Sequence, residues 1–214
     1  MTPHVRSAEK PDHLLWEQGG EFDEATYLEI FGQAIDAFRS AGRPFLLFGG
    51  LASSYFGRPR STHDIDIFVK GADADEFLKE LEAHAFRTQR TYPDWLYKAL
   101  KEGVLVDVIF RSAGNIYMDE EMISRAKTGE IFGREVPLLP PEDMVVIKAT
   151  AHKENSPRHL HDVVAILSKQ ALDWEYLVWR ARLGVRRVLS FLLFARSEGV
   201  EVPWEALVRL ARGI

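Results

Sequence analysis

Two aspartates interrupt a segment that otherwise has the composition of a buried β-strand. The segment reads DIDIFV, and Ile65 separates Asp64 from Asp66. Because alternate residues of a strand point to the same face, we expect both carboxylates on one face, opposite Ile65 and Ile67. Neighbouring ionised carboxylates repel each other, and burial increases the repulsion. A divalent cation relieves it, and Mg²⁺ prefers carboxylate oxygens, so the segment predicts a metal site for a phosphate-bearing ligand.

A third carboxylate lies in a second apolar segment. Asp107 is the one charged residue of VLVDVIF, and an uncompensated charge inside such a strand is costly. If this strand adjoins the first, Asp64, Asp66 and Asp107 would together hold two metal ions. Two ions can stabilise the entering and leaving oxygens of a phosphoryl or nucleotidyl transfer. The alternative is that these aspartates are solvated residues at strand ends.

A pair of glycines precedes the first two aspartates. Gly49 and Gly50 follow the apolar run PFLLF, and the sequence LASSYF after them predicts a helix that begins just past the glycines. Without side chains, the backbone can approach a phosphate closely, and free N–H groups at a helix start attract anions. Ser53 and Ser54 would add hydroxyl donors in the first turn. We therefore expect a phosphate site beside the carboxylates.

The chain as a whole predicts a mixed α/β (α+β) fold, in which a mixed sheet is flanked by helices and followed by a helical bundle. The segment of residues 23–42 opens with acidic residues and ends near a glycine, as a helix does. Residues 73–86 predict a second, amphipathic helix. WLYKAL and VLVDVIF flank the turn KEG and predict a β-hairpin, and EIFGREVPLL predicts another. After Pro140 all signals are helical, so we expect a catalytic domain at 1–139 and a helical domain at 140–214.

The composition excludes some classes of protein and predicts a location. The 214 residues carry a net charge of −5 and include no cysteine, so disulfides and thiolate metal sites are excluded. The amino end lacks the apolar core of a signal peptide, and the longest apolar run, VLSFLLFA, is too short to span a bilayer. We therefore expect a cytoplasmic protein without a membrane partner.

These motifs together resemble the DNA-polymerase-β-like nucleotidyltransferase superfamily. Its signature is a strand that ends in Gly-Gly or Gly-Ser, a helix, Asp-x-Asp in the next strand, and a third Asp on a later strand. The string GGLASSYFGRPRSTHDIDI looks more specifically like minimal bacterial nucleotidyltransferases related to the AbiEii and MenT toxins. RST at residues 60–62 resembles their Arg-x-Thr. Lys148 and RHLHDV resemble a later helical element, although His159 stands where toxin-like members often carry Asp.

The resemblance implies an enzyme that moves a nucleoside monophosphate from an NTP to an acceptor hydroxyl and releases pyrophosphate. It implies Mg²⁺ or Mn²⁺ as cofactor and Asp64, Asp66 and Asp107 as catalytic, metal-binding residues. The residues that it implies for nucleotide binding, ATP included, are Gly49, Gly50, Ser53, Arg60, Thr62 and Lys148. Separately, Asp162 interrupts the apolar pattern of LHDVVAIL and would either pair with Lys148 or Arg158 and position them, or be an exposed helix residue.

The acceptor stays open at this stage. Toxin-like relatives use tRNA 3′ ends or proteins, and other members modify aminoglycoside hydroxyls. A toxin of this kind would have a cognate antitoxin as partner. The basic run RARLGVRR, residues 180–187, would either contact a polynucleotide backbone or form a solvated helix face. Two other classes compete with an enzyme: a nucleotide-binding module without turnover, and an interaction protein whose aspartates are structural.

Overall fold

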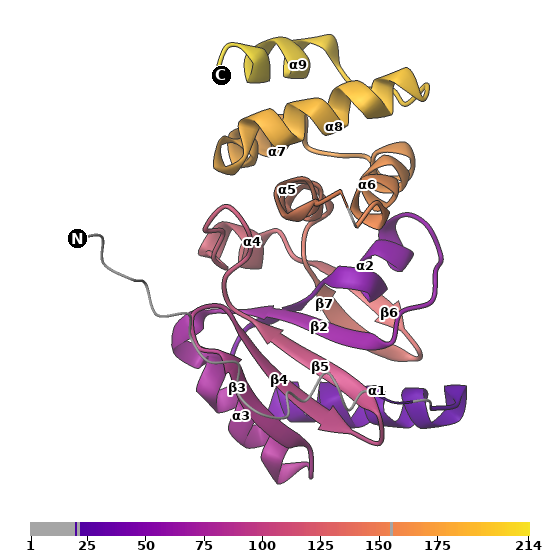
Figure 1. Cartoon of the computed structure of the whole chain (residues 1–214), viewed down its shortest axis with the longest axis vertical. Coiled ribbons are helices and arrows are strands. Elements are labelled where there is room, and N and C mark those ends of the chain that lie inside the picture. The colour runs from indigo at the N-terminus through magenta and orange to yellow at the C-terminus, as the bar shows by residue number, and fades with distance from the viewer. Residues whose placement is uncertain (1–19, 21, 155) are drawn as a thin grey trace, which may run out of the picture.

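A mixed β-sheet forms the centre of the computed structural model, which describes residues 20, 22–154 and 156–214 (Figure 1). In this part of the chain the sheet has seven strands in the order β3-β4-β5-β2-β1-β7-β6. The strands are β1 (Phe45–Leu47), β2 (Asp64–Val69), β3 (Arg87–Tyr92), β4 (Leu96–Lys101), β5 (Val104–Ile109), β6 (Lys127–Ile131) and β7 (Arg134–Leu138). A mixed sheet flanked by helices confirms the predicted fold class.

Strand pairing confirms both predicted hairpins and brings the two aspartate-bearing strands together. β4 pairs with β5, and β6 with β7, in antiparallel fashion. β2 pairs with β5 in parallel and with β1 in antiparallel fashion. The sequence analysis does not predict β3, because RTQRTY is polar and has no apolar alternation. As an edge strand that pairs with β4, it exposes most of its side chains.

Helices α1 (Glu24–Ser40) and α3 (Ala74–Ala83) pack together on one face of the sheet (Figure 1). Asp23 caps α1, because its carboxylate accepts a hydrogen bond from the Thr26 N–H at 2.8 Å. Ile65 and Ile67 are fully buried within the core. Their alternation leaves Asp64 and Asp66 for the other face, as the sequence predicts.

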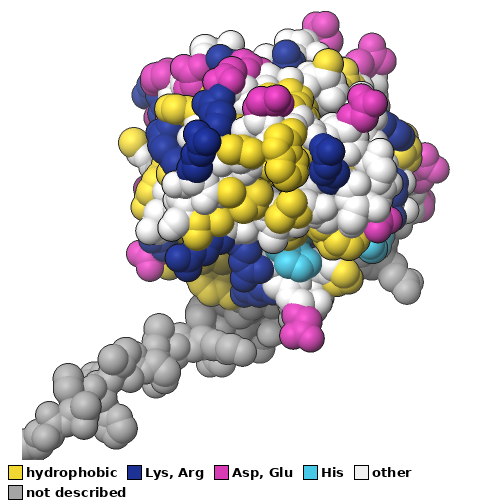
Figure 2. Space-filling view, turned by 90° about the horizontal axis from the view of Figure 1, so that it is seen from above, with side chains coloured by type: hydrophobic (Ala, Val, Ile, Leu, Met, Phe, Trp, Pro, Cys, Tyr) yellow, Lys and Arg dark blue, Asp and Glu magenta, His cyan; other side chains and the backbone are white. Residues whose placement is uncertain are grey.

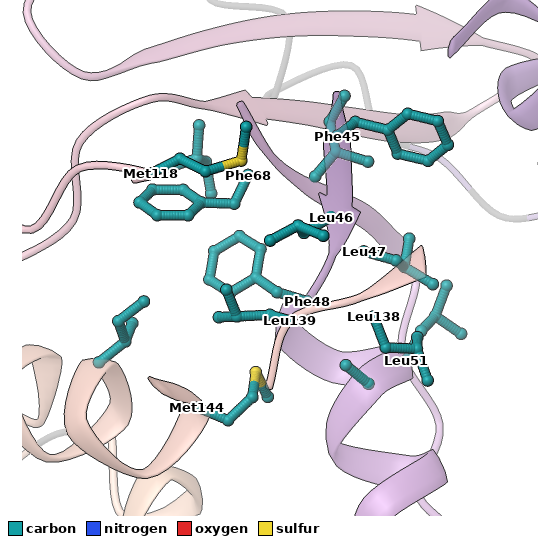
Figure 3. Packing of buried hydrophobic residues seen from close by; sticks show 14 of the residues in the cluster. Phe45, Leu46, Leu47, Phe48, Leu51, Phe68, Met118, Leu138, Leu139 and Met144 are labelled. Atoms are coloured by element: carbon teal, nitrogen blue, oxygen red, sulfur yellow. The ribbon is translucent and has the colours of Figure 1, made fainter. Parts of the chain in front are cut away.

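The other face of the sheet is covered by α2 (Gly49–Phe56), α5 (Pro141–Ala151) and α6 (Arg158–Lys169). The short helix α4 (Glu120–Ser124) precedes β6. Figure 3 shows apolar side chains of β1, β2, α2 and α5 packed together, among them Phe48, Phe68 and Met144. The rings of Phe48 and Phe68 are 5.7 Å apart between centroids. This shared core holds α2 and α5 against the strands that carry the aspartates.

The remaining helices, α7 (Trp174–Arg180), α8 (Val185–Ser197) and α9 (Trp204–Ala211), form the carboxyl-terminal end of the molecule (Figure 1). Arg180 is buried there, with its Nε 2.7 Å from Asp143 Oδ1 and its Nη1 2.6 Å from Asp119 Oδ2. Neither alternative given for residues 180–187, a polynucleotide contact or a solvated helix face, therefore holds for Arg180. Its guanidinium forms ion pairs with two buried or partly buried aspartates, Asp143 and Asp119, and the local sequence does not reveal these partners. Arg182, Arg186 and Arg187 are exposed.

The hydrophobic core runs through the predicted domain boundary. Leu138 and Leu139 belong to the same buried cluster as Met144, so the division at residue 139 stays a prediction. In the described part of the chain, no helix is both long and apolar enough to cross a membrane. The amino-terminal segment that entered the prediction of location lies outside the described residues.

Candidate active site

The pairing register of β2 and β5 places Asp66 directly beside Asp107. The two residues are Cα partners in the parallel ladder, and Asp64 lies two residues before Asp66 on the same face. Each of these three side chains keeps partial exposure, and all three open into one cavity. Two adjacent strands thus bring together the three carboxylates that the sequence analysis singled out.

This concentration of negative charge changes the acidity of the carboxyl groups. Burial raises the pKa of Asp66 to about 7, and the charges of Asp107 and Asp64 add to the effect. Burial also raises the pKa of Asp107, while the ammonium of Lys98 opposes that shift. The nearby Tyr27 hydroxyl has a raised pKa, first through burial and then through the charges of Asp66 and Asp64. The site therefore lacks enough positive charge of its own to balance its carboxylates.

Lys98 is a site residue that sequence reasoning missed. It lies on β4 as the antiparallel partner of Asp107, and its Nζ is 2.5 Å from Asp107 Oδ1. Only 8% of the residue is exposed. Counting back from the predicted three-residue turn KEG would place Tyr97 opposite Asp107. In the structure Lys101 pairs with Val104, and this shorter turn places Lys98 opposite Asp107.

The two glycines contact the site as closely as the sequence predicts, but the helix begins at them and not after them. Gly49 has a φ of +63°, and a Cβ there would lie 2.0 Å from Asp66 Oδ2. The Gly50 N–H donates to the same oxygen at 3.4 Å, and a Cβ at Gly50 would lie 2.4 Å from Thr62 Oγ1. Because side chains at these positions would clash, the first turn of α2 can lie directly on Asp66 and Thr62.

The two serines of α2 have roles other than the predicted one. Ser53 is fully buried and does not line the cavity, because its hydroxyl donates to the Gly49 carbonyl at 2.5 Å. Ser54 holds the following loop: its hydroxyl donates to the Arg60 carbonyl at 3.1 Å and accepts from the Arg60 N–H at 3.3 Å. The geometry thus gives Ser53 a part in shaping the glycine turn and no direct path to a ligand.

On the opposite wall, Asp162 of α6 binds two cations. Lys148 Nζ lies 2.9 Å from Asp162 Oδ2, and Arg60 Nε lies 3.3 Å from Oδ1. Burial alone would raise the pKa of Asp162, but the charges and hydrogen bonds of Lys148 and Arg60 outweigh it and keep the pKa below its usual value. Burial lowers the pKa of Lys148. Asp162 therefore positions Lys148, one of the two pairings expected, together with Arg60, which was not expected as its partner.

A cavity of about 660 Å³ joins these groups. It is lined by all the residues predicted for metal or phosphate binding except the two serines, Ser53 and Ser54. Residues that sequence reasoning did not assign to the site also line it, among them Trp95, Arg111, Lys153, Arg158 and His159. One side of the cavity is thus acidic and the other is basic, which suits a ligand that carries both cations and phosphates. Among the described residues, no three carboxylates or imidazoles converge as a ready-made metal cage.

A glycine turn lies against an Asp-x-Asp strand, with a third Asp on the neighbouring parallel strand, which is the arrangement that the resemblance to nucleotidyltransferases predicts. Residues 18–197 match the model of the family described as "Uncharacterised nucleotidyltransferase". The match covers most of the chain, which therefore belongs to this family and is a nucleotidyltransferase. Comparison with curated protein sequences finds no match to the chain.

Solved structures show the same fold at low sequence identity. The solution structure of the antibiotic-resistance factor ANT(2'')-Ia has a TM-score of 0.55 and 18% identity, over 83% of this chain and 95% of that one. The crystal structure of ANT(2")-Ia with adenylyl-2"-tobramycin gives 0.52 and 19%, over 81% and 99%. Lincomycin-bound LnuA, a lincosamide antibiotic adenylyltransferase, gives 0.50 and 15%, over 69% and 99%. At these identities the likeness shows the fold alone.

Proposed function

We propose that this nucleotidyltransferase transfers a nucleoside monophosphate from an NTP to a hydroxyl of a tRNA 3′ end, in a reaction that requires Mg²⁺ or Mn²⁺. The observation that carries the proposal is the close contact of Gly49 and Gly50 with Asp66, which in turn lies beside Asp107. A backbone that can receive phosphates adjoins carboxylates that need cations. A triphosphate with its divalent ion satisfies both.

The three aspartates suit a divalent ion by the chemistry of their donor atoms. Asp64, Asp66 and Asp107 offer only carboxylate oxygens, and burial followed by mutual repulsion already raises the pKa of Asp66. Asp64 and Asp66 would hold the ion. When bound, the ion would neutralise phosphate charge at the reacting phosphorus and at the pyrophosphate leaving group.

The basic wall and the glycine turn would bind and orient the triphosphate. Gly49, Gly50 and Thr62 line the cavity together with Asp66. Lys148 and Arg60 stand across from them, positioned by Asp162. These fixed donors hold the α-phosphorus in line with the acceptor, and most of the rate enhancement would come from positioning and charge neutralisation.

Asp107 is the residue that would act on the acceptor. One of its oxygens is held by Lys98, which leaves the other to accept a proton from the acceptor hydroxyl. The hydroxyl oxygen then forms a bond to the α-phosphorus, and the bond from that phosphorus to the bridging oxygen of pyrophosphate breaks. The pyrophosphate leaves toward the basic wall.

The lining of the cavity favours an anionic acceptor with stackable rings. Trp95 lines the cavity and stacks on Tyr92, with ring centroids 5.2 Å apart and an angle of 13° between the planes. Arg111, Lys153 and Arg158 add positive charge to the same cavity. A polycationic aminoglycoside would be repelled by these groups, whereas the 3′ end of an RNA offers bases to stack and phosphates to bind.

The start of α8, which carries two exposed arginines, adjoins the cavity. Gly114 lines the cavity, and a Cβ there would lie 2.9 Å from the Leu183 carbonyl, so the start of α8 adjoins the cavity wall. The exposed Arg186 and Arg187 follow in the first turn of α8. Figure 2 looks onto this carboxyl-terminal end and shows Lys and Arg side chains among apolar and acidic ones. This surface would extend the acceptor site.

An antibiotic is the second candidate acceptor, favoured by the fold shared with antibiotic adenylyltransferases. The test incubates the protein with each of the four α-labelled NTPs, Mg²⁺ or Mn²⁺, and either tRNA, total cell protein, or aminoglycosides and lincomycin. The proposal expects label on tRNA. Label on an antibiotic alone would show that the acceptor is an antibiotic and not tRNA. No label on any acceptor, in a protein that still binds NTP, would favour a nucleotide-binding module without turnover.

The toxin role is a separate part of the proposal, supported by the resemblance of GGLASSYFGRPRSTHDIDI to toxin-type enzymes. It predicts that expression arrests growth and that a cognate antitoxin relieves the arrest. Expression of the wild type and of Asp66→Asn in the same host measures this. Equal growth of the two strains would contradict the toxin role and would leave the proposal of nucleotidyl transfer unaffected.

A further inference from the structure

We propose that the ammonium of Lys98 takes the place of one of the two divalent ions that three carboxylates would otherwise hold. The site then binds a single divalent ion, at Asp64 and Asp66, while Lys98 serves as the fixed cation of Asp107. This inference rests on the proposed function and concerns the same site.

The position of Lys98 follows from the register of three strands. Lys98, Asp107 and Asp66 are consecutive partners across β4, β5 and β2 and form one row on the cavity face. The Lys98 Nζ is 2.5 Å from Asp107 Oδ1, and the side chains of the pair are only 10% and 13% exposed. A buried ammonium in direct contact with a carboxylate is held in place, because either charge alone would be costly there.

Among the cations of the described residues near the three aspartates, Lys98 is the one that compensates the charge of one of these carboxylates. Among the ion pairs of the described residues, that of Lys98 alone includes one of the three aspartates. The cations of the opposite wall, Lys148 and Arg60, are engaged by Asp162. Lys98 therefore compensates one carboxylate of three, and the remaining two match the charge of one divalent ion.

A second divalent ion at Asp107 would have to approach this ammonium. Like charges at contact distance in a partly buried site repel strongly. Lys98 also fixes one oxygen of Asp107 and so orients the other toward the acceptor. Lys98 is thus a positioning residue, whose effect passes through Asp107.

The experiment titrates Mn²⁺ into the full-length protein and follows free Mn²⁺ by electron paramagnetic resonance, without nucleotide. Wild type is expected to bind one ion. Lys98→Met is expected to gain a second ion, or to bind Mn²⁺ about tenfold more tightly, because a repelling charge is lost. Lys98→Arg, which keeps the charge, should behave like wild type.

A matched control and a second readout keep the result interpretable. Lys101→Met removes the same charge from the same strand, where the Lys101 Nζ donates to Gln33 Oε1 and the His84 carbonyl and not to an aspartate; it should leave Mn²⁺ binding unchanged. In transfer assays, the rate should depend on Mg²⁺ hyperbolically for wild type and Lys98→Arg. The dependence should become sigmoidal for Lys98→Met.

Each outcome bears on one claim. Two ions on wild type, or unchanged binding in Lys98→Met with its fold intact by circular dichroism, would overturn the role of Lys98 and leave the proposed function standing. A wild type that binds no Mn²⁺ would overturn the inference, and the proposed function, in which the ion can arrive with the triphosphate, would then be decided by the label-transfer assay. If Lys98→Met does not fold, a wild type and Lys98→Arg that both bind two ions would still overturn the inference, and one ion on each would support it.

Discussion

A Cβ atom on Gly49 would lie 2.0 Å from the Asp66 Oδ2 atom, closer than two such atoms can approach. Gly49 also has a φ of +63°, a conformation that other residues adopt only at a cost. The contact ties the start of α2 to the carboxylate of β2. It explains why a chain with two aspartates in one strand also needs a glycine at this position.

Gly49→Ala should therefore lower transfer by about 100-fold or more, because it displaces Asp66 from its position. Gly42→Ala is the matched control. Gly42 has a φ of +61°, and a Cβ there would meet nothing within 4 Å. The control should lower the free energy of unfolding by about 1 kcal/mol through backbone strain and leave the rate unchanged. Equal rates for the two variants would contradict the close-contact role of Gly49.

Asp66→Asn should abolish transfer and stabilise the protein without metal. The gain in free energy of unfolding should be about 1–3 kcal/mol at pH 8, because a buried carboxylate that two others repel loses its charge. Since the pKa of Asp66 is raised from 3.8 to about 7, wild type loses stability as pH rises through this range. The variant should lose less, because only the raised pKa values of other groups such as Asp107 and Asp143 remain. Urea unfolding in EDTA at pH 5 and pH 8 measures the free energy of unfolding of wild type and of Asp66→Asn. A variant less stable than wild type at pH 8 would refute the repulsion.

His159 should make stability depend on pH at the acidic end. Burial lowers its pKa from 6.5 to about 4, and the charges of Lys148 and Arg158 add to the effect. The unfolded chain therefore binds more protons between these values, so stability falls as pH falls from about 6.5 to about 4. His159→Gln should reduce this loss by about 1–2 kcal/mol, after allowance for partial exposure. His161→Gln, on an exposed position of the same helix, should leave the profile as it is. Parallel profiles for wild type and His159→Gln would exclude the effect.

The arginines at the start of α8 should matter only for a polyanionic acceptor. Arg186→Ala combined with Arg187→Ala should weaken tRNA modification and reduce its salt dependence, with little effect on NTP binding, because each lost phosphate contact removes counterion release. Arg39→Ala with Arg43→Ala, also exposed but near the end of α1, serves as the control. An RNA reaction indifferent to both salt and the α8 pair would exclude this surface from the acceptor site.

Much of this fold can be predicted from local patterns in the sequence. Period-two alternation in DIDIFV and the KEG turn predict β2 and the β4–β5 hairpin, since each depends on near neighbours in the chain. The polar edge strand β3 escaped prediction, because pairing along one edge needs no apolar face. The predicted start of α2 was also too late in the sequence, because Gly49 and Gly50 form the first turn of the helix.

The site divides in the same way. Asp64, Asp66 and Asp107 stood out because carboxylates are costly in apolar strands. The ion pairs of Lys98 with Asp107 and of Arg60 with Asp162 could not be predicted, because they depend on which segments are neighbours in the fold. Ser53 looked like a ligand donor in the sequence, yet its hydroxyl bonds within its own helix. Arg180 looked like a surface cation and is buried between Asp143 and Asp119. Long-range partners decide such cases, and local patterns do not contain them.

The position of the label on the NTP tests the central claim most directly. With Mg²⁺ and tRNA, label from the α-phosphate should appear on the acceptor, label from the γ-phosphate should appear only in pyrophosphate, and Asp66→Asn should show neither. This result would establish nucleotidyl transfer at the Asp64–Asp66–Asp107 site. Transfer of the γ-label to the acceptor, or α-label transfer that persists in Asp66→Asn at the wild-type rate, would contradict it.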